Sequence, residues 1–259
     1  MSRFIVPLDL GDSSYDKSLF FLRKYIGQKA MGKTVAAYIG GAKKKILVDA
    51  GLPDMERSLK YHPYFRAEPR APEQEMLGAL AKAGVKPEEI DIVILTHLHW
   101  DHVGTVDQFP NAQFIVSDRE LKFALNPTPC LYASYEALQL GIQPMFLKVI
   151  NRIKTVDMVE KEILEGVRII PLPGHSPGGI GVVVETDEGP YVLAGDAVPT
   201  YDNLKGDPAS NQPYIMSGVY TDMLEMWKSF ELVDEIVRGD IRKVIPGHEP
   251  LVLKKERYP

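Results

Sequence analysis

The stretch His97-Leu98-His99-Trp100-Asp101-His102 places three imidazoles and one carboxylate within six residues. The whole chain of 259 residues contains only six histidines, so half of them lie in this one segment. Neutral imidazole and carboxylate groups are the ligands that zinc and similar divalent metals prefer. Four such donors so close together cannot all reach one ion in good geometry. The segment therefore predicts a site for two metal ions rather than one.

Three more candidate ligands lie further along the chain. His175 and His248 each end a Pro-Gly-His turn, and Asp196 follows Gly195. Like the first cluster, each follows a short apolar run typical of a β-strand; the runs cover residues 90–95, 167–170, 191–193 and 243–245. Loops that leave buried strands present side chains from a rigid support. Such regularity is hard to obtain by chance, and it favours one shared metal site.

The rest of the chain alternates short β-rich runs with glycine and proline. We expect hairpins from residues 35–39 with 45–48 and from residues 180–184 with 191–193, and a strand at 113–116. Helices are expected at residues 73–84, 117–125, 133–153 and 221–238, where apolar side chains recur at helical spacing or dominate. No internal repeat or low-complexity linker interrupts this order.

Composition excludes several classes of protein. The net charge of −5 disfavours nucleic-acid binding, which usually requires a basic surplus. No run of about 18 apolar residues occurs, so no membrane span is expected. The N-terminal apolar stretch is too short for a signal peptide, and Cys130 is the only cysteine, so no internal disulfide can form. A reducing, cytoplasmic location is expected.

Other residues are assigned to the surroundings of the metals. His62 lies in an aromatic loop without acidic neighbours, and it is expected to form a wall of the substrate cleft rather than to bind metal. Asp49 is expected to hold loops together by hydrogen bonds near the site. An apolar channel for an acyl chain or aromatic ring is expected from residues 61–65, 145–147 and 214–216. The same exposed aromatic loops could serve a homodimer.

The ordered set of histidines and aspartates resembles the metallo-β-lactamase superfamily, whose pattern is His-x-His-x-Asp-His followed by His, Asp and His. The resemblance runs from about residue 33 to about residue 250. It implies an α+β fold, a four-layer αββα sandwich of two mixed sheets, in one domain over residues 1–259 with a helical insertion at about 118–165. Within the superfamily, the Pro-Gly-His-Ser-Pro-Gly and Gly-Asp-Ala segments and the insertion resemble N-acyl-homoserine lactonases and pyridoxolactonases.

The resemblance implies roles for individual residues. Of the seven implied metal ligands, three bind a first zinc, three bind a second and one bridges both: His97, His99 and His175; Asp101, His102 and His248; and Asp196. Iron, manganese or cobalt could replace zinc. Several lactonases carry a tyrosine three residues after the bridging aspartate, where this chain has Pro199. Tyr201 and Tyr220, or else Tyr214, are the candidates to take over that catalytic role.

These assignments predict a dinuclear zinc hydrolase that opens a lactone, or cleaves a carboxylic ester, through a metal-bridging hydroxide. Asp101 would be both ligand and proton shuttle, and the partner would be a small-molecule lactone or ester. A thioesterase of the glyoxalase II kind and a phosphotriesterase remain as alternatives. So does a mononuclear-iron dioxygenase, which keeps the same histidine pattern, whereas flavodiiron proteins replace the second histidine by glutamate.

Overall fold

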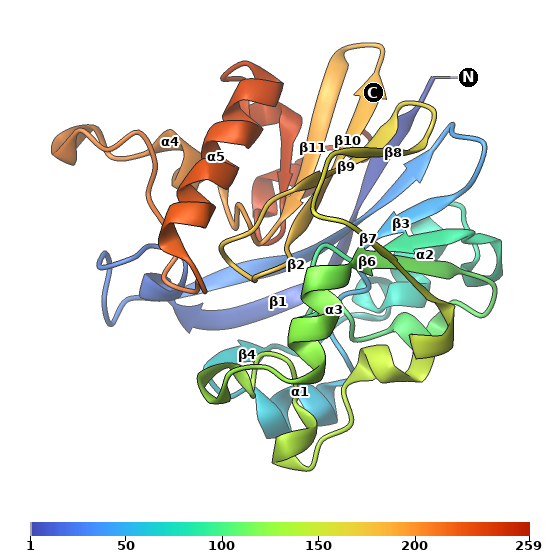
Figure 1. The fold of residues 1–259 in the computed structure, drawn as a ribbon, viewed down its shortest axis with the longest axis horizontal. Helices are drawn as coiled ribbons and strands as arrows, with labels where there is room; N and C mark the ends of the chain where they lie inside the picture. The colour runs from blue at the N-terminus through green and yellow to red at the C-terminus, as the bar shows by residue number, and fades with distance from the viewer. Residues whose placement is uncertain (1) are drawn as a thin grey trace.

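The computed structural model describes residues 2–259 and contains two mixed β-sheets (Figure 1). The first has seven strands in the order β4-β1-β2-β3-β5-β6-β7: β1 (Phe4–Asp16), β2 (Lys29–Gly40), β3 (Ile46–Val48), β4 (Phe65–Ala67), β5 (Ile92–Ile94), β6 (Gln113–Ser117) and β7 (Ile153–Val156). The second has five in the order β12-β11-β10-β9-β8: β8 (Lys161–Leu164), β9 (Val167–Pro171), β10 (Ile180–Thr186), β11 (Gly189–Gly195) and β12 (Val244–Pro246).

Each sheet contains both antiparallel and parallel strand pairs, in separate parts of the sheet. In the first sheet, β4, β1, β2 and β3 pair antiparallel, whereas β3, β5, β6 and β7 pair parallel. In the second, β8 to β11 pair antiparallel and β12 pairs parallel to β11. Parallel neighbours place their carboxyl ends at the same edge of a sheet, and the segment 97–102, Asp196 and His248 follow such ends, at β5, β11 and β12.

Alternation along the central strands separates two apolar cores. Ile92 and Ile94 of β5 point into the core shared with the second sheet, whereas Val93 points to the opposite face. Because successive side chains of a strand point to opposite faces, a strand apolar at every position must be covered on both. The same division holds in β2, β3 and β6.

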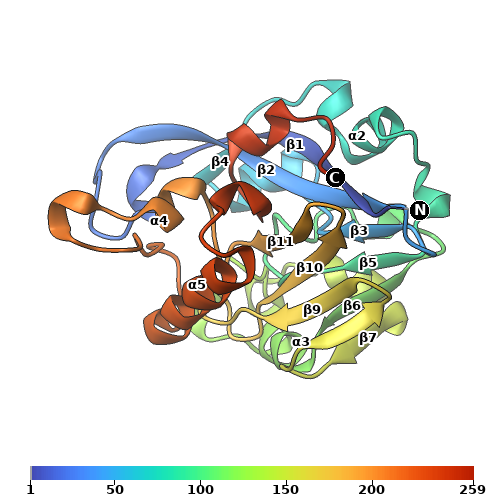
Figure 2. The ribbon, with the colours of Figure 1, turned by 90° about the horizontal axis from the view of Figure 1, so that it is seen from above.

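Helices supply the outer layers (Figure 2). Helices α2 (Met76–Lys82) and α3 (Asp118–Leu125) contribute to the core on the outer face of the first sheet, and α5 (Met223–Val237) packs on the second. Helices α1 (Met55–Tyr61) and α4 (Tyr201–Lys205) are shorter. The short 3-10 helices are Lys17–Leu19, Pro72–Gln74, Pro87–Glu89, Val106–Gln108, Pro129–Leu131, Leu138–Leu140, Met145–Arg152, Pro208–Ser210, Ile241–Lys243 and Pro250–Lys254. The expected αββα sandwich is confirmed.

Two local expectations differ from the structure. The stretch 133–153 contains only the short 3-10 helices Leu138–Leu140 and Met145–Arg152, and β7 and β8 follow within the expected helical insertion. Strand β1 was not expected, because Pro7, Gly11 and three aspartates obscure its apolar alternation. The structure accommodates Gly11 with a φ of 110° at a register shift between Asp9 and Asp12. Among residues 2–259, no helix is both long and apolar enough to cross a bilayer.

Candidate metal centre

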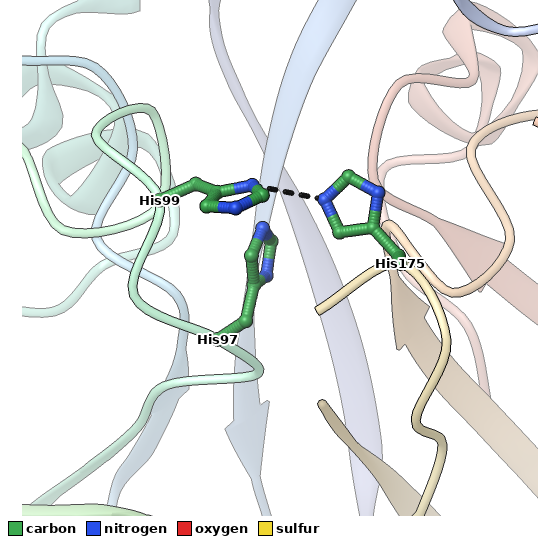
Figure 3. A group of neighbouring side chains, drawn as sticks. All are labelled: His97, His99 and His175. Carbon is green, nitrogen blue, oxygen red and sulfur yellow. Dashed lines mark hydrogen bonds between the residues drawn. The ribbon is translucent and has the colours of Figure 1, made fainter. Parts of the chain in front are cut away.

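Loops from both sheets bring the candidate ligands together. The segment from His97 to His102 follows β5 of the first sheet, whereas His175, Asp196 and His248 follow β9, β11 and β12 of the second. Figure 3 shows the imidazoles of His97, His99 and His175 directed toward one another from these two sides. The predicted ligands, far apart in sequence, therefore meet between the two sheets.

The seven side chains form two adjoining groups. His97, His99 and His175 can each offer one ligand atom such that these atoms lie within 4.8 Å of one another. The same holds for a second group, composed of Asp101, His102, Asp196 and His248. All seven residues are buried, none more than 6% exposed. Water does not solvate these polar groups freely, so they must satisfy one another or bind a cation.

Asp196 lies between the two groups. Its Oδ1 is 3.2 Å from Nε2 of His102, and its Oδ2 is 3.5 Å from Nε2 of His175. Gly247 allows this close packing, since a Cβ there would lie 2.4 Å from Oδ1 of Asp196. The Pro-Gly-His turn before His248 therefore needs its glycine.

Hydrogen bonds orient most of the histidines toward the centre. Their Nδ1–H groups donate outward: His102 to Asp49 (2.8 Å), His175 to the carbonyl of Val219 (3.0 Å) and His248 to the carbonyl of Lys33 (2.8 Å). A neutral imidazole that donates through Nδ1 offers the lone pair of Nε2. Such bonds from the far ring nitrogen are what hold histidine ligands in metal sites.

Asp49 organises the first sheet's side of the centre, as its sequence position predicted. It accepts hydrogen bonds from the backbone and hydroxyl of Thr96, at 2.7 and 2.8 Å, besides the bond from His102. The Thr96 oxygen in turn lies 3.1 Å from Nδ1 of His97. Asp49 has a φ of 63°, a left-handed conformation that aspartate tolerates better than most residues. One carboxylate thus orients two of the candidate ligands.

Burial and nearby charges shift the pKa values of the histidines differently in the two groups. Burial and the neighbouring imidazoles hold the pKa of His97 and that of His99 well below their usual value. Burial also lowers the pKa of His175, despite the opposing effect of Asp196. These three rings are therefore neutral at physiological pH, which is the form that binds metal.

The second group is more strongly influenced by its carboxylates. Burial opposes protonation of His102, but Asp196 and the other nearby carboxylates outweigh it and hold the pKa of His102 well above its usual value. The pKa of His248 is raised in the same way, mainly by Asp196. Burial opposes ionisation of Asp196 itself, but His248 and His102 hold its pKa well below the usual range.

Several ligand atoms have no hydrogen-bond partner within the protein. Among residues 2–259, Nε2 of His97 and Nε2 of His99 are fully enclosed without one. Nε2 of His102 and Oδ1 of Asp196 are also enclosed and have the ion-pair contact with each other, at 3.2 Å, in place of a well-formed hydrogen bond. Leaving a polar atom buried and unpaired costs about 1–3 kcal/mol. Two unpaired imidazole nitrogens beside this ion pair would be costly in a merely structural role. Their positions and chemistry fit divalent metal ions, which accept the lone pairs of both imidazole and carboxylate.

Glu120 of α3 is a supporting residue that the sequence analysis missed. Its buried carboxylate accepts hydrogen bonds from the backbone of Leu98 (3.0 Å) and Gly178 (2.9 Å), and from Tyr135 (2.9 Å). Gly178 permits this approach, because a Cβ there would lie 2.1 Å from the Glu120 nitrogen. Glu120 thereby ties the loop of His97 and His99 to the loop of His175. An acidic residue in the first turn of an otherwise ordinary helix carries no sequence signal for this role.

A pocket of about 200 Å³ opens onto the cluster. His99, Asp101, His175, Asp196 and His248 form its ligand side. Its walls are mostly aromatic or apolar and come from Leu19, Phe20, Tyr61, His62, Tyr64, Phe65, Trp100, Ala133, Ser134 and Val219. The expected positions of His62 and of residues 61–65 in the cleft wall are confirmed. Residues 145–147 and 214–216 do not line this pocket.

The tyrosines expected to replace the one absent at Pro199 do not reach the centre. Tyr201 is buried, and its hydroxyl donates to the carbonyl of Val244 at 3.0 Å in the core under the second sheet. Tyr214 donates to Asp234 and lines a separate groove of about 630 Å³ beside α5. Tyr220 is 37% exposed and is not among the pocket residues. The assignment of Tyr201 to catalysis is therefore withdrawn, because its hydroxyl is paired with Val244 in the core. The role of Tyr220 stays a prediction that the pocket lining does not support.

A family model for the metallo-β-lactamase superfamily matches residues 32–248. The protein belongs to this superfamily. An N-acyl homoserine lactonase of a Bacillus species is 30% identical over 172 residues, which make up 62% of this chain and 62% of that protein. The chain thus matches less than two thirds of the length of this lactonase.

Solved structures share the fold. A variant of AiiA from Bacillus thuringiensis with N-decanoyl-L-homoserine bound has a TM-score of 0.75 at 22% identity and covers 98% of this chain and 96% of that one. The dizinc quorum-quenching lactonase AidC, in complex with a product, has a TM-score of 0.70 at 18% identity over 96% and 88% of the two chains. This superfamily member therefore has the lactonase-like metallo-hydrolase fold and a candidate metal centre.

Metal loading should strengthen as the pH rises. The raised pKa values of His102 and His248 keep both rings protonated near neutral pH in metal-free protein. A metal ion must displace these protons, so the apparent affinity should increase as the pH rises toward the raised pKa values, and binding should release protons. Calorimetric titration with zinc in buffers of different ionisation enthalpy measures that release. Affinity independent of pH, with no proton release, would contradict this electrostatic picture.

Replacing Glu120 should weaken the centre without touching a ligand. In Glu120→Gln, the amide NH₂ faces backbone N–H donors, so one loop must shift. We expect the affinity for zinc to fall about 10- to 100-fold, as for other residues that support metal ligands. Competition with a chromophoric chelator measures it, and Asp118→Asn, a half-buried change on the same helix that removes only the ion pair with Lys122, is the matched control. Equal affinities in the two variants would show that Glu120 does not position the ligands.

Proposed function

We propose that this protein is a dinuclear zinc hydrolase that opens the lactone ring of N-acyl-homoserine-lactone-like substrates. The observation that carries the proposal is the pair of buried ligand groups, adjoining at Asp196, beside a mostly apolar pocket. The similarity to N-acyl homoserine lactonases, one of them described as dizinc, supports the choice of metal and substrate class.

The ligands divide by position. We assign His97, His99 and His175 to one ion. Asp101, His102 and His248 are assigned to the other. Asp196 is assigned to both, since it lies 3.2 Å from Nε2 of His102 and 3.5 Å from Nε2 of His175. Iron, manganese or cobalt would suit the same donors, because imidazole and carboxylate are ligands for all of them.

Bound divalent ions supply an activated water and polarise the substrate carbonyl. The chain's own residues orient the substrate and exclude bulk water. Asp101 lines the pocket, and its Oδ2 lies 3.8 Å from Nε2 of His102 and 3.7 Å from Nε2 of His248. We assign to Oδ2 of Asp101 the transfer of a proton from the attacking water to the ring oxygen that leaves. Water adds across the ester bond, so the products are a carboxylate and an alcohol in one molecule.

The pocket walls favour a substrate that carries an apolar substituent. Phe20, Phe65 and Trp100 present aromatic surface next to the ligands, and Leu19 and Val219 continue it. Apolar pockets with few polar groups bind ligands mainly through burial of alkyl or aromatic surface. An acyl chain beside the lactone ring suits these walls.

Purified protein should contain two zinc ions per chain and open N-hexanoyl-homoserine lactone in a pH-indicator assay. The same assay should give far lower rates with thioesters and phosphotriesters. Asp101→Asn should lower kcat by about 100-fold or more, the usual contribution of a proton-transfer group. The exposed Asp187→Asn, in the hairpin between β10 and β11, is the control and should retain full activity.

Other outcomes would replace the proposal. About one metal per chain, or iron without hydrolysis, would point to a mononuclear dioxygenase. Preferred hydrolysis of thioesters or phosphotriesters would identify one of those activities instead. Full activity in His102→Ala would remove the second ion from the account.

A further inference from the structure

His62, Glu136 and Arg57 form a hydrogen-bonded group in the pocket wall, outside the seven candidate ligands. We propose that His62 accepts a hydrogen bond from the amide N–H of an N-acyl lactone, and that Glu136 and Arg57 hold it in the form that accepts. This inference rests on the proposed lactonase function and adds a specificity-determining residue to it. No role in metal binding is involved.

The ring of His62 is fixed in place. His62 ends α1, is 6% exposed and stacks flat on Trp100, with ring centroids 3.7 Å apart and ring planes 2° apart. Trp100 lies between His99 and Asp101 in the chain, so the stack anchors His62 directly beside the centre. The stack on Trp100 fixes one face of the ring and the contact with Glu136 fixes one edge, so the other edge, which carries Nδ1, points in a defined direction.

Glu136 determines which nitrogen carries the proton. Nε2 of His62 lies 3.1 Å from Oε1 of Glu136, and Nε of Arg57 lies 2.9 Å from each Glu136 oxygen. Burial opposes ionisation of Glu136, but the hydrogen bonds from His62 and Arg57 outweigh it and lower its pKa. An ionised carboxylate only accepts, so Nε2 must donate. The tautomer of His62 that donates through Nε2 carries its lone pair on Nδ1.

The hydrogen-bonded group requires an unfavourable backbone conformation at Glu136. Glu136 is 1% exposed and has a φ of 46°, a conformation that L-residues other than glycine rarely adopt. Arg57 also donates to the carbonyl of Gln143, at 2.6 Å, and so holds the loop that carries Glu136. Backbone strain of this kind persists where surrounding contacts enforce it, and it is found most often at functional sites.

Nδ1 of His62 is available to a substrate. Within residues 2–259 it makes no hydrogen bond, and it is not among the fully enclosed polar atoms, while the residue lines the pocket with Asp101 and Asp196. A lactone ring and an alkyl chain offer this acceptor no N–H donor, whereas an amide does. A site built to pair with a substrate donor discriminates against an analogue that lacks it.

The test compares two lactones that differ at one atom. They are N-hexanoyl-homoserine lactone and its analogue in which CH₂ replaces the amide N–H. Wild-type protein should prefer the amide in kcat/KM, and His62→Phe, which keeps the aromatic stack, should reduce that preference about threefold to tenfold, the usual effect of one neutral hydrogen bond. The change should appear mainly in KM. Glu56→Gln, an exposed change on α1, is the control.

The preference ratio is measured within one preparation, so it does not depend on the fraction of active protein. An equal loss on both lactones in His62→Phe, or a wild-type ratio near one, would overturn the role of His62 and leave the proposed function standing. If wild-type protein opens neither lactone, the proposed function fails and this inference fails with it.

Discussion

The burial of five imidazoles and two carboxylates in one cluster is the constraint on which the rest of the structure depends. Such groups cannot be withdrawn from water without partners, and several of their lone pairs have none within the protein. Divalent cations resolve the conflict, since they accept lone pairs from both kinds of group. The fold can therefore be understood as a support that holds these donors together in advance.

That support comes from both sheets and both outer layers. The two sheets pack face to face and direct the loops after β5, β9, β11 and β12 to one place. Asp49 fixes the ligands on one side through Thr96 and His102, and Glu120 joins the loops of the first ligand group. Backbone carbonyls orient His175 and His248. The directions of His97, His102, His175 and His248 are thus set by contacts independent of any metal.

Much of this could be predicted from the sequence because the signals are local. The clustered histidines and the Pro-Gly-His turns carried the family resemblance that implied the sandwich, and the structure brings all seven candidate ligands together. Asp49 and His62 could be assigned because both lie close to recognisable segments.

The features that the sequence did not predict depend on contacts between segments far apart in the chain. Glu120 and Glu136 look like ordinary acidic residues until the loops of His175 and His62 pack against them. Tyr201 is close in sequence to Asp196, yet the turn into α4 sends its hydroxyl to Val244. Spacing along the chain does not determine side-chain direction across a turn. Strand β1 was missed because its irregular register conceals the alternation of apolar residues.

The central claim is that two ions lie side by side, on either side of Asp196. Anomalous diffraction at the zinc absorption edge, from crystals of the zinc-loaded protein, tests it most directly. The account predicts two peaks about 3.5–4 Å apart, the separation usual in two-metal hydrolases, one beside His97 and His99 and the other beside His102 and His248. A single peak, or two peaks that Asp196 does not contact, would contradict it.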